Sequence, residues 1–316
     1  MVLTMKIIHG PSYRYQGERL AAPEIIWIQD HHYDPNHGHA LRQLLDHSLC
    51  AADQHLLVFD HVLIQDEFGQ YPHVCLPLLL AAETEEFNRE AIVPDWGRRT
   101  HAFNFMINKP RPHRQIMMDV ILEHRLTNYK HTLCWAGGYG NIPGTDYRFG
   151  DERTMDRGVR NGHHTNASTY NRLLRAAVFE PTTVSLITES AFVERETIIT
   201  EKTLMAIWAG NLPVWVGGWR CADSMKHMGF DVFDDVIDHS YQSLADPQDR
   251  CRQAMVMNLA VLSGMIDLAP FQERLQHNLN LLRSNPFRSM VWDRVRDHPE
   301  LASIVNHYRG GLLTRS

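Results

Sequence analysis

Residues 200–217, TEKTLMAIWAGNLPVWVG, decide how the second half of the chain folds. A threonine before an apolar segment is a typical helix cap, and Gly210 followed by Asn211 is a typical helix end. The apolar residues from Pro213 onward then indicate a short buried strand. A helix that leads at once into a buried strand predicts an α/β domain with parallel strands.

The first helical residues, Glu201 and Lys202, indicate a binding site for a nucleotide diphosphate. Backbone N–H groups at a helix start point outward and bind anions, and a lysine there adds positive charge. The helix dipole disfavours a cation at this end, and the negative charge of a bound diphosphate would offset that cost for Lys202. Glu201 is expected to accept a hydrogen bond from a ribose hydroxyl. The alternatives are a solvated first-turn lysine and a glutamate that merely favours the helix.

Three blocks in this region resemble the donor-binding signature of the α1,3-fucosyltransferase family. They are residues 186–190 (LITES), 199–202 (ITEK) and 209–217 (AGNLPVWVG). The family has Glu-Asn-Ser in the first block, so this chain departs from the pattern at Ser190. The resemblance implies a glycosyltransferase that moves a sugar from a GDP- or UDP-sugar to a carbohydrate or other hydroxyl acceptor, with inversion.

A basic, proline-containing segment, NKPRPHR at 108–114, follows the strand predicted at 101–107. Ligands of α/β sheets bind outside the carboxyl ends of strands, where this loop is expected to lie. Arginine suits bidentate contact with phosphate. The resembled family places an arginine after the first strand of its donor domain, and Arg114 matches it, with Arg111 close by. The alternative is a basic turn on the surface.

Glu189 follows the strand predicted at 183–187, and we assign it to the catalytic set through contact with the donor sugar. Helix capping or ion pairing is the alternative for this residue. Ser190 and Arg195 are expected to contact the donor, Arg195 through its base or phosphates. The resemblance also implies an aromatic residue that stacks on the base, and Phe192 is the aromatic residue in the segment.

An inverting transfer needs a carboxylate that accepts the proton of the attacking hydroxyl. We assign this role to Asp60, which ends an apolar run in the first half of the chain. Asp30, Asp66 and Glu67 are the alternatives. Each of these carboxylates could also be an ordinary loop residue.

The segment 30–39 is rich in histidine and aspartate, a composition that can bind metal ions. Its spacing matches no closed metal site, and Pro35 and Gly38 predict a loop that faces solvent or lines the acceptor site. We therefore assign no metal ligand and require no cofactor, with a divalent cation left open. The competing hypothesis is a metal-dependent hydrolase built on this segment.

Composition argues against a mainly electrostatic grip on nucleic acid. The 316 residues carry a net charge of −6, and the five cysteines form no Cys-x-x-Cys pair. No apolar run approaches the ~20 residues that span a bilayer. The N-terminus resembles a strand more than a signal peptide, so no membrane anchor and a cytoplasmic, bacterial or viral enzyme are expected. A transferase that modifies a viral DNA base and a non-catalytic nucleotide-binding module are further alternatives.

Strands and helices alternate along the chain, which predicts an α/β fold. With the resemblance, this pattern implies two Rossmann-like domains of the GT-B type and a helical C-terminal tail. The expected segments are an acceptor-side domain (1–97), a donor domain (98–285) and the tail (286–316). Strands are predicted at 24–28, 101–107, 132–136, 183–187, 214–216 and 232–233, and further apolar runs lie at 55–60 and 73–80.

Overall fold

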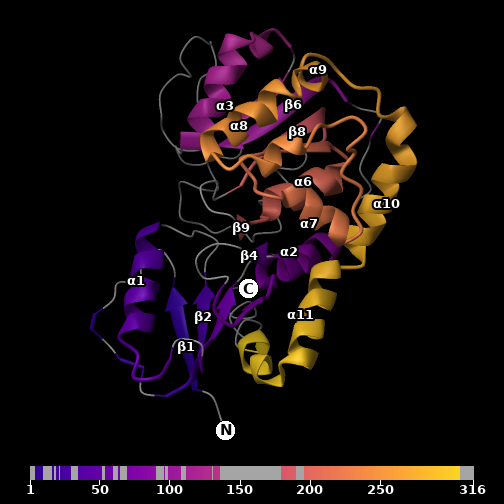
Figure 1. Cartoon of the computed structure of the whole chain (residues 1–316). Coiled ribbons are helices and arrows are strands. Elements are labelled where there is room, and N and C mark those ends of the chain that lie inside the picture. The colour runs from indigo at the N-terminus through magenta and orange to yellow at the C-terminus, as the bar shows by residue number, and fades with distance from the viewer. Residues whose placement is uncertain are drawn as a thin grey trace, which may run out of the picture. The chain divides into compact units, whose positions relative to one another are not determined.

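The chain folds into an α/β structure with parallel sheets, as predicted (Figure 1). The structure is a computed structural model. It divides into two compact units: unit 1 contains residues 1–82, 194–198 and 286–316, and unit 2 contains residues 83–193 and 199–285. The described residues are 4–9, 16–17, 19–20, 22–29, 35–51, 54–59, 63–64, 70–89, 96, 99–107, 112–129, 131–135, 179–189 and 196–306.

Unit 1 is built on a four-stranded parallel sheet in the order β1-β2-β3-β5. Its strands are β1 (Thr4–His9), β2 (Glu24–Gln29), β3 (Leu56–Phe59) and β5 (His73–Cys75). Strand β4 (Leu63–Ile64) pairs antiparallel with β9 (Glu196–Thr197) in a separate ribbon. Among the described strands of the main sheet, the order follows the sequence without reversal.

Both faces of this sheet are covered, because its strands are apolar on both sides. Ile26 and Ile28 pack in a cluster with α1 (Pro35–Asp46), and Ile25 and Trp27 pack in a cluster with α11 (Pro286–Asp297) (Figure 1). Helix α11 therefore completes unit 1, although it lies near the end of the chain. The compact units thus differ from the expected segments: residues 286–316 join unit 1, and the first boundary falls after residue 82.

Proline marks the start of two helices in unit 1, and one of them contradicts a prediction. The segment predicted as a loop at 35–38 begins α1, since proline is well suited to the first helical position. The apolar run at 73–80 divides into β5, which ends at Cys75, and α2 (Leu78–Arg89). Pro77 precedes that helix, where its missing N–H costs no intrahelical hydrogen bond.

Unit 2 contains a four-stranded parallel sheet in the order β10-β8-β6-β7. Its strands are β6 (His101–Ile107), β7 (His131–Trp135), β8 (Thr182–Thr188) and β10 (Leu212–Val216). The chain moves from β6 to β7 on one side and returns to β8 on the other side of β6. The order therefore reverses between β6 and β8, and ligands of open α/β sheets bind at such a reversal, outside the carboxyl ends of the strands.

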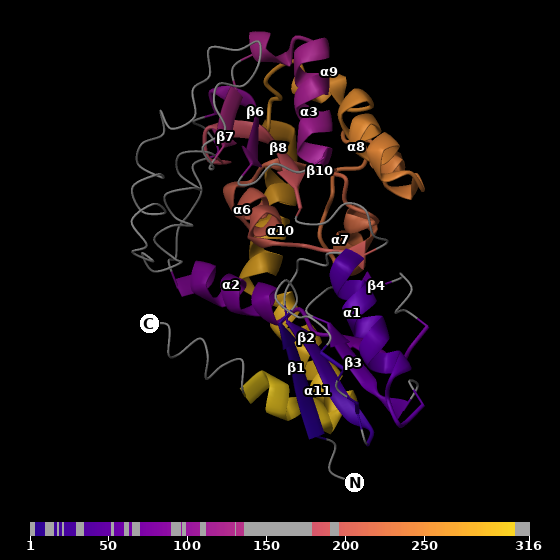
Figure 2. The ribbon, with the colours of Figure 1, turned by 90° about the vertical axis from the view of Figure 1, so that its left-hand side faces the viewer.

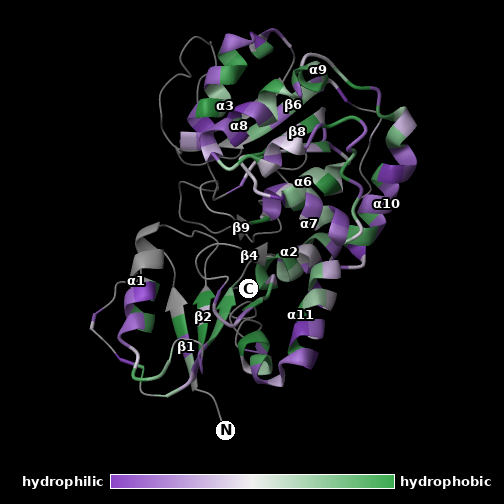
Figure 3. Ribbon diagram, viewed as in Figure 1, coloured by the Kyte–Doolittle hydropathy of each residue, from purple (hydrophilic) through white to green (hydrophobic). Residues whose placement is uncertain are grey.

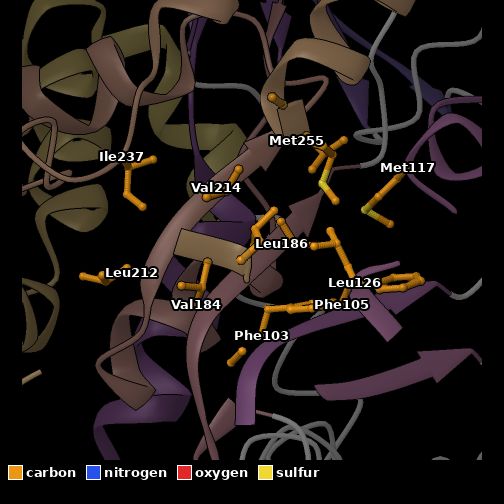
Figure 4. Packing of buried hydrophobic residues seen from close by; sticks show 14 of the residues in the cluster. Phe103, Phe105, Met117, Leu126, Val184, Leu186, Leu212, Val214, Ile237 and Met255 are labelled. Atoms are coloured by element: carbon orange, nitrogen blue, oxygen red, sulfur yellow. The ribbon is translucent and has the colours of Figure 1, made fainter. Parts of the chain in front are cut away.

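Helices cover both faces of the sheet in unit 2 (Figure 2). On one face, α3 (Pro112–Glu123) packs against α8 (Pro247–Val256). On the other face, α6 (Glu201–Ala209) packs against α10 (Gln272–Arg283). Figure 4 shows Phe105 and Leu186 of the sheet beside Met117 of α3 and Met255 of α8. The side chain of Trp215 alternates with those of its neighbours in β10 and contacts α6 instead.

The segment after β10 is mostly helical, as predicted for the stretch from about residue 249, within the described residues up to 306. Helices α10 and α11 carry hydrophilic residues beside hydrophobic ones (Figure 3), which suits helices with one buried side. In the described part of the chain, no helix is long and apolar enough to cross a membrane. The remaining helical segments are η3 (Leu126–Asn128), α7 (Cys221–His227), η5 (Ser240–Ser243), α9 (Leu259–Leu262), η6 (Ala269–Phe271) and η7 (Pro299–Leu301).

The strand predicted at 232–233 does not form, because Phe233 has φ 59° and leaves the extended region. A network around Arg274 holds this conformation. The guanidinium donates to both oxygens of Asp231 (2.5 and 2.8 Å) and of Asp235 (2.9 and 2.8 Å). It also lies 4.7 Å from the centre of the Phe233 ring, and Asp231 Oδ1 accepts from Phe233 N (2.8 Å).

We expect Arg274→Gln to lower the free energy of unfolding at pH 7 by about 1–2 kcal/mol, through lost charged hydrogen bonds. Hydrogen bonds from Arg274 lower the pKa of Asp235. Burial alone would raise the pKa of Asp231, but the hydrogen bonds from Arg274 lower it overall. The folded protein thus holds these protons less tightly than the unfolded chain, whose aspartates titrate near 3.8.

The stabilisation by Arg274 is therefore complete above the pH at which the unfolded aspartates titrate. It is lost as the pH falls through the pKa values of Asp231 and Asp235 in the folded protein. Urea unfolding between pH 7 and pH 2 should show the gap between wild type and Arg274→Gln closing below about pH 4. Arg220→Gln, which removes an exposed ion pair with Asp223, serves as the control with little effect at any pH. A difference in the free energy of unfolding that stays constant from pH 7 to pH 2 would contradict a stabilising role for the hydrogen bonds between Arg274 and the two aspartates.

Candidate functional site

The predicted cap and end of α6 are both confirmed. Thr200 is the N-cap in an extended conformation, and its Oγ1 accepts from Lys202 N at 3.4 Å. Gly210 ends the helix with φ 69°, a left-handed conformation that glycine adopts without strain. A side chain at Gly210 would also collide with Trp96. Local sequence signals therefore specify both ends of α6. The start of the helix lies at the carboxyl end of β8, because Thr200 is hydrogen-bonded to Glu189.

The carboxylate of Glu189, the residue after β8, anchors the start of α6. Oε1 accepts from Thr200 N (3.0 Å) and Thr203 Oγ1 (2.7 Å), and Oε2 accepts from Thr200 Oγ1 (2.5 Å). Glu189 is only 1% exposed. Burial raises the pKa of this carboxyl group overall, and the charge of Lys202 and the hydrogen bonds from the two threonines offset only part of that rise. Its hydrogen-bond partners thus belong to the helix start.

Lys202 is buried, which differs from the exposed lysine that a first helical turn usually carries. Its side chain is 10% exposed, and Nζ lies 2.9 Å from Glu201 Oε1 and 3.2 Å from Thr200 Oγ1. An ammonium group has three N–H donors. Among the described residues, these are the two acceptors, so the third donor is available to an oxygen atom of a ligand. The Glu201 side chain is more accessible, at 31%.

The first turn of α3, the helix that follows the neighbouring strand β6, also contacts Glu189. His113 Nε2 donates to the backbone oxygen of Glu189 at 3.1 Å, so this nitrogen carries the proton. Arg114 follows within the first turn of the helix, which begins at Pro112, and is 4% exposed. The prediction that Arg114 closes the loop at 108–114 is therefore wrong, because proline again starts the helix earlier than expected. The burial of Arg114 also contradicts the alternative of a basic turn on the surface.

The structure thus gathers two helix starts at the reversal between β6 and β8. Glu189 contacts Thr200 of the α6 start and His113 of the α3 start, so residues from three elements meet at this edge of the sheet. Two buried cationic side chains, Arg114 and Lys202, belong to these starts. The arrangement can place two positive charges and the positive ends of two helix dipoles near an anion.

Three residues of this site, Thr203, Trp215 and His113, were not predicted from the sequence. Trp215 Nε1 donates to Thr203 Oγ1 at 2.8 Å, and that hydroxyl donates to Glu189. Thr203 follows Thr200 by three positions, a spacing that places two residues on one side of a helix and was a usable signal. His113 and Trp215 gave no local signal, because their partners lie on other elements.

Several predicted residues lie outside the described residues, and the structure does not place them. They are Asp60, Arg111, Ser190 and Arg195, together with Phe192 and the alternative bases Asp30, Asp66 and Glu67. The side chains of His37 and His39 also lie outside. Within the described part of the chain, no group of three His, Cys, Asp or Glu residues could hold a metal ion.

Comparison of the chain with known protein families, curated proteins and solved structures found no match.

Proposed function

We propose that this protein is a glycosyltransferase that uses a nucleotide-diphosphate sugar and inverts the transferred centre. The single observation that supports the proposal best is the pairing of buried Lys202 and Arg114 with two helix starts at the sheet reversal of unit 2. A diphosphate leaving group carries concentrated negative charge, and fixed positive groups stabilise it most where water is excluded.

The two cationic residues have complementary roles in this proposal. Lys202 supplies a point charge whose third N–H is directed by its two described acceptors. Arg114 supplies a planar guanidinium suited to bidentate contact with phosphate, with Arg111 as its predicted neighbour. Together with the dipole of α6 they would neutralise the leaving group, so the proposal requires no metal ion.

Glu189 acts in the proposal by holding the helix start in place. Its two oxygens are occupied by Thr200 and Thr203, which favours helix anchoring over direct contact with the donor sugar. Glu201, whose side chain is the more accessible, is the candidate acceptor for a ribose hydroxyl. Ser190 and Arg195 stay as predicted contacts with the donor.

Unit 2 would bind the donor and unit 1 would contribute to the acceptor side, as in two-domain GT-B glycosyltransferases with Rossmann-like domains. The acceptor in this proposal is a carbohydrate or another hydroxyl compound. Asp60 stays our prediction for the general base, since an inverting transfer needs a carboxylate near the attacking hydroxyl.

A thermal-shift screen tests the proposal directly. GDP, UDP, dTDP and their sugar conjugates should be compared at concentrations well above the expected Kd, since ligand binding to the folded state raises Tm. We expect stabilisation by one nucleoside diphosphate and its sugar, and weaker stabilisation by the monophosphate. Absence of a shift with every diphosphate would count against the proposal. NMR of the anomeric centre of the product would establish inversion.

We expect Arg114→Lys to weaken nucleoside diphosphate binding nearly as much as Arg114→Ala. A lysine keeps the charge but cannot make the two parallel hydrogen bonds of a guanidinium. Calorimetric titration of each variant with the nucleotide found in the screen gives the comparison. Arg252→Lys is the matched control, because Arg252 of α8 forms an exposed ion pair with Glu123 of α3. If Arg114→Lys retains most of the affinity for the nucleoside diphosphate, Arg114 does not make a bidentate contact with phosphate.

A further inference from the structure

A chain of buried hydrogen bonds connects β10 to the ammonium group of Lys202. Trp215 Nε1 donates to Thr203 Oγ1 (2.8 Å), and Thr203 donates to Glu189 Oε1 (2.7 Å). On the other side of the carboxylate, Thr200 Oγ1 donates to Oε2 (2.5 Å) and accepts from Lys202 Nζ (3.2 Å). The chain therefore crosses from the sheet through the end of β8 to the start of α6.

Chemistry determines the direction of every hydrogen bond in this chain. An indole N–H and an ammonium group can only donate, and an ionised carboxylate can only accept. The hydroxyl groups of Thr203 and Thr200 must therefore both point their protons toward Glu189. With Glu189 ionised, these hydrogen bonds therefore run in one direction, which holds each group in one orientation.

The members of the chain are shielded from water, so no solvent molecule replaces a lost partner easily. Trp215, Thr203, Glu189 and Thr200 are each at most 1% exposed. Lys202 is 8% exposed, and it is the member with a donor left for a ligand among the described residues. Through Glu189 and Thr200, a change at Trp215 or Thr203 can reach the ammonium group of Lys202.

We propose that Thr203 and Trp215 are positioning residues for anion binding, which act through Glu189 and Thr200 to direct the ammonium group of Lys202. The inference rests on the proposed function, because it takes a diphosphate as the group that Lys202 meets. A small displacement of a charged donor from its acceptor is enough to reduce binding strongly. Neither positioning residue needs to touch the ligand.

Thr203→Val tests this inference, because valine keeps the shape and removes the hydroxyl. Calorimetric titration with inorganic pyrophosphate and with GDP and UDP should show affinity about tenfold weaker than wild type. Thr203→Ser keeps the hydroxyl and should recover most of the affinity. Thr183→Val is the matched control, since Thr183 is equally buried and donates to the oxygen of Ala102 (2.7 Å), away from the chain. It should bind pyrophosphate like wild type.

Trp215→Phe is a second variant in case Thr203→Val does not fold. It removes the indole N–H and also makes the buried ring smaller, and we expect a loss of affinity of about threefold. The indole N–H resonance of Trp215 should also shift when Thr203→Val removes its acceptor.

A double-mutant cycle separates positioning from general damage. In a Lys202→Met background, Thr203→Val should cause no further loss of pyrophosphate affinity, because the residue it acts on is gone. A loss of the same size in both backgrounds would overturn the inference, as would unchanged affinity in Thr203→Val.

The outcomes also separate this inference from the proposed function. One outcome is that Thr203→Val weakens pyrophosphate binding in the wild-type background alone while no sugar nucleotide is consumed. That result would support the positioning role and contradict glycosyl transfer. If a sugar nucleotide is turned over and Thr203→Val behaves like wild type, the function stands and the inference falls. A wild-type protein that binds neither pyrophosphate nor any nucleoside diphosphate overturns both.

Discussion

Replacing Lys202 with methionine is expected to slow sugar transfer by about 10²–10³ at saturating donor, while the protein stays folded. Methionine preserves the unbranched apolar stem that packs at this buried position and removes the charge. The lost contact is one that strengthens as the diphosphate departs, so the loss should appear in kcat as well as in kcat/KM. Release of nucleoside diphosphate from the sugar nucleotide measures it.

The fold should survive this substitution, because the ion-pair partner of Lys202 is accessible to water. The Glu201 side chain is 31% exposed and can be hydrated when the ammonium group is removed, so we expect a cost of about 1 kcal/mol. Lys226→Met is the control, since Lys226 forms an ion pair with Asp234 on the exposed surface of unit 2. Turnover near the wild-type rate in Lys202→Met would remove the residue from the site.

Replacing Arg99 with methionine is expected to lower the free energy of unfolding by about 3 kcal/mol, the largest effect on stability among our predictions. Its guanidinium donates to the backbone oxygens of Glu180 (2.6 Å) and Thr182 (2.8 Å), and to that of Ala209 at the end of α6. It also donates to Asn211 Oδ1 at 2.8 Å. Without Arg99, these acceptors lose a cation that also complements the helix dipole.

Urea unfolding at pH 7 measures this cost. Arg99→Lys should recover only part of it, because one ammonium group cannot reach acceptors that lie around a planar guanidinium. Arg252→Met, at an exposed ion pair, should change the free energy of unfolding by less than about 1 kcal/mol. A cost for Arg99→Met as small as that of the control would show that the carbonyl groups find other donors.

Local signals predicted much of the fold in unit 2. The strand at 101–107 matches β6, and the cap at Thr200 and the end at Gly210 match α6, because each depends on residues within one helical turn or one strand. The strand predicted at 232–233 failed for a different reason. Phe233 takes a left-handed conformation that its own side chain disfavours, and contacts with its near neighbour Asp231 and with Arg274, which is distant in the sequence, hold it there.

For the candidate site, the sequence singled out Glu189, Glu201 and Lys202 as neighbours in a motif, and Arg114 through its position after a strand. It could not show that Glu189 binds Thr200 and Thr203, nor that Lys202 is buried. The burial and the hydrogen-bond partners of a residue depend on the segments that pack against it, and here those segments belong to other helices and strands.

The sequence by itself determined the alternation of strands and helices, the two ends of α6 and the polar residues that follow β8, because these depend on propensities and caps within a few residues. Only the tertiary structure decided that α11 covers the sheet of unit 1 and that Arg99 reaches Asn211 across 112 positions of the chain. It also decided that Trp215 orients the hydroxyl of Thr203. Such contacts form when hydrophobic burial brings distant segments together and buried polar groups must then find partners, and neither requirement leaves a signal within a local stretch of sequence.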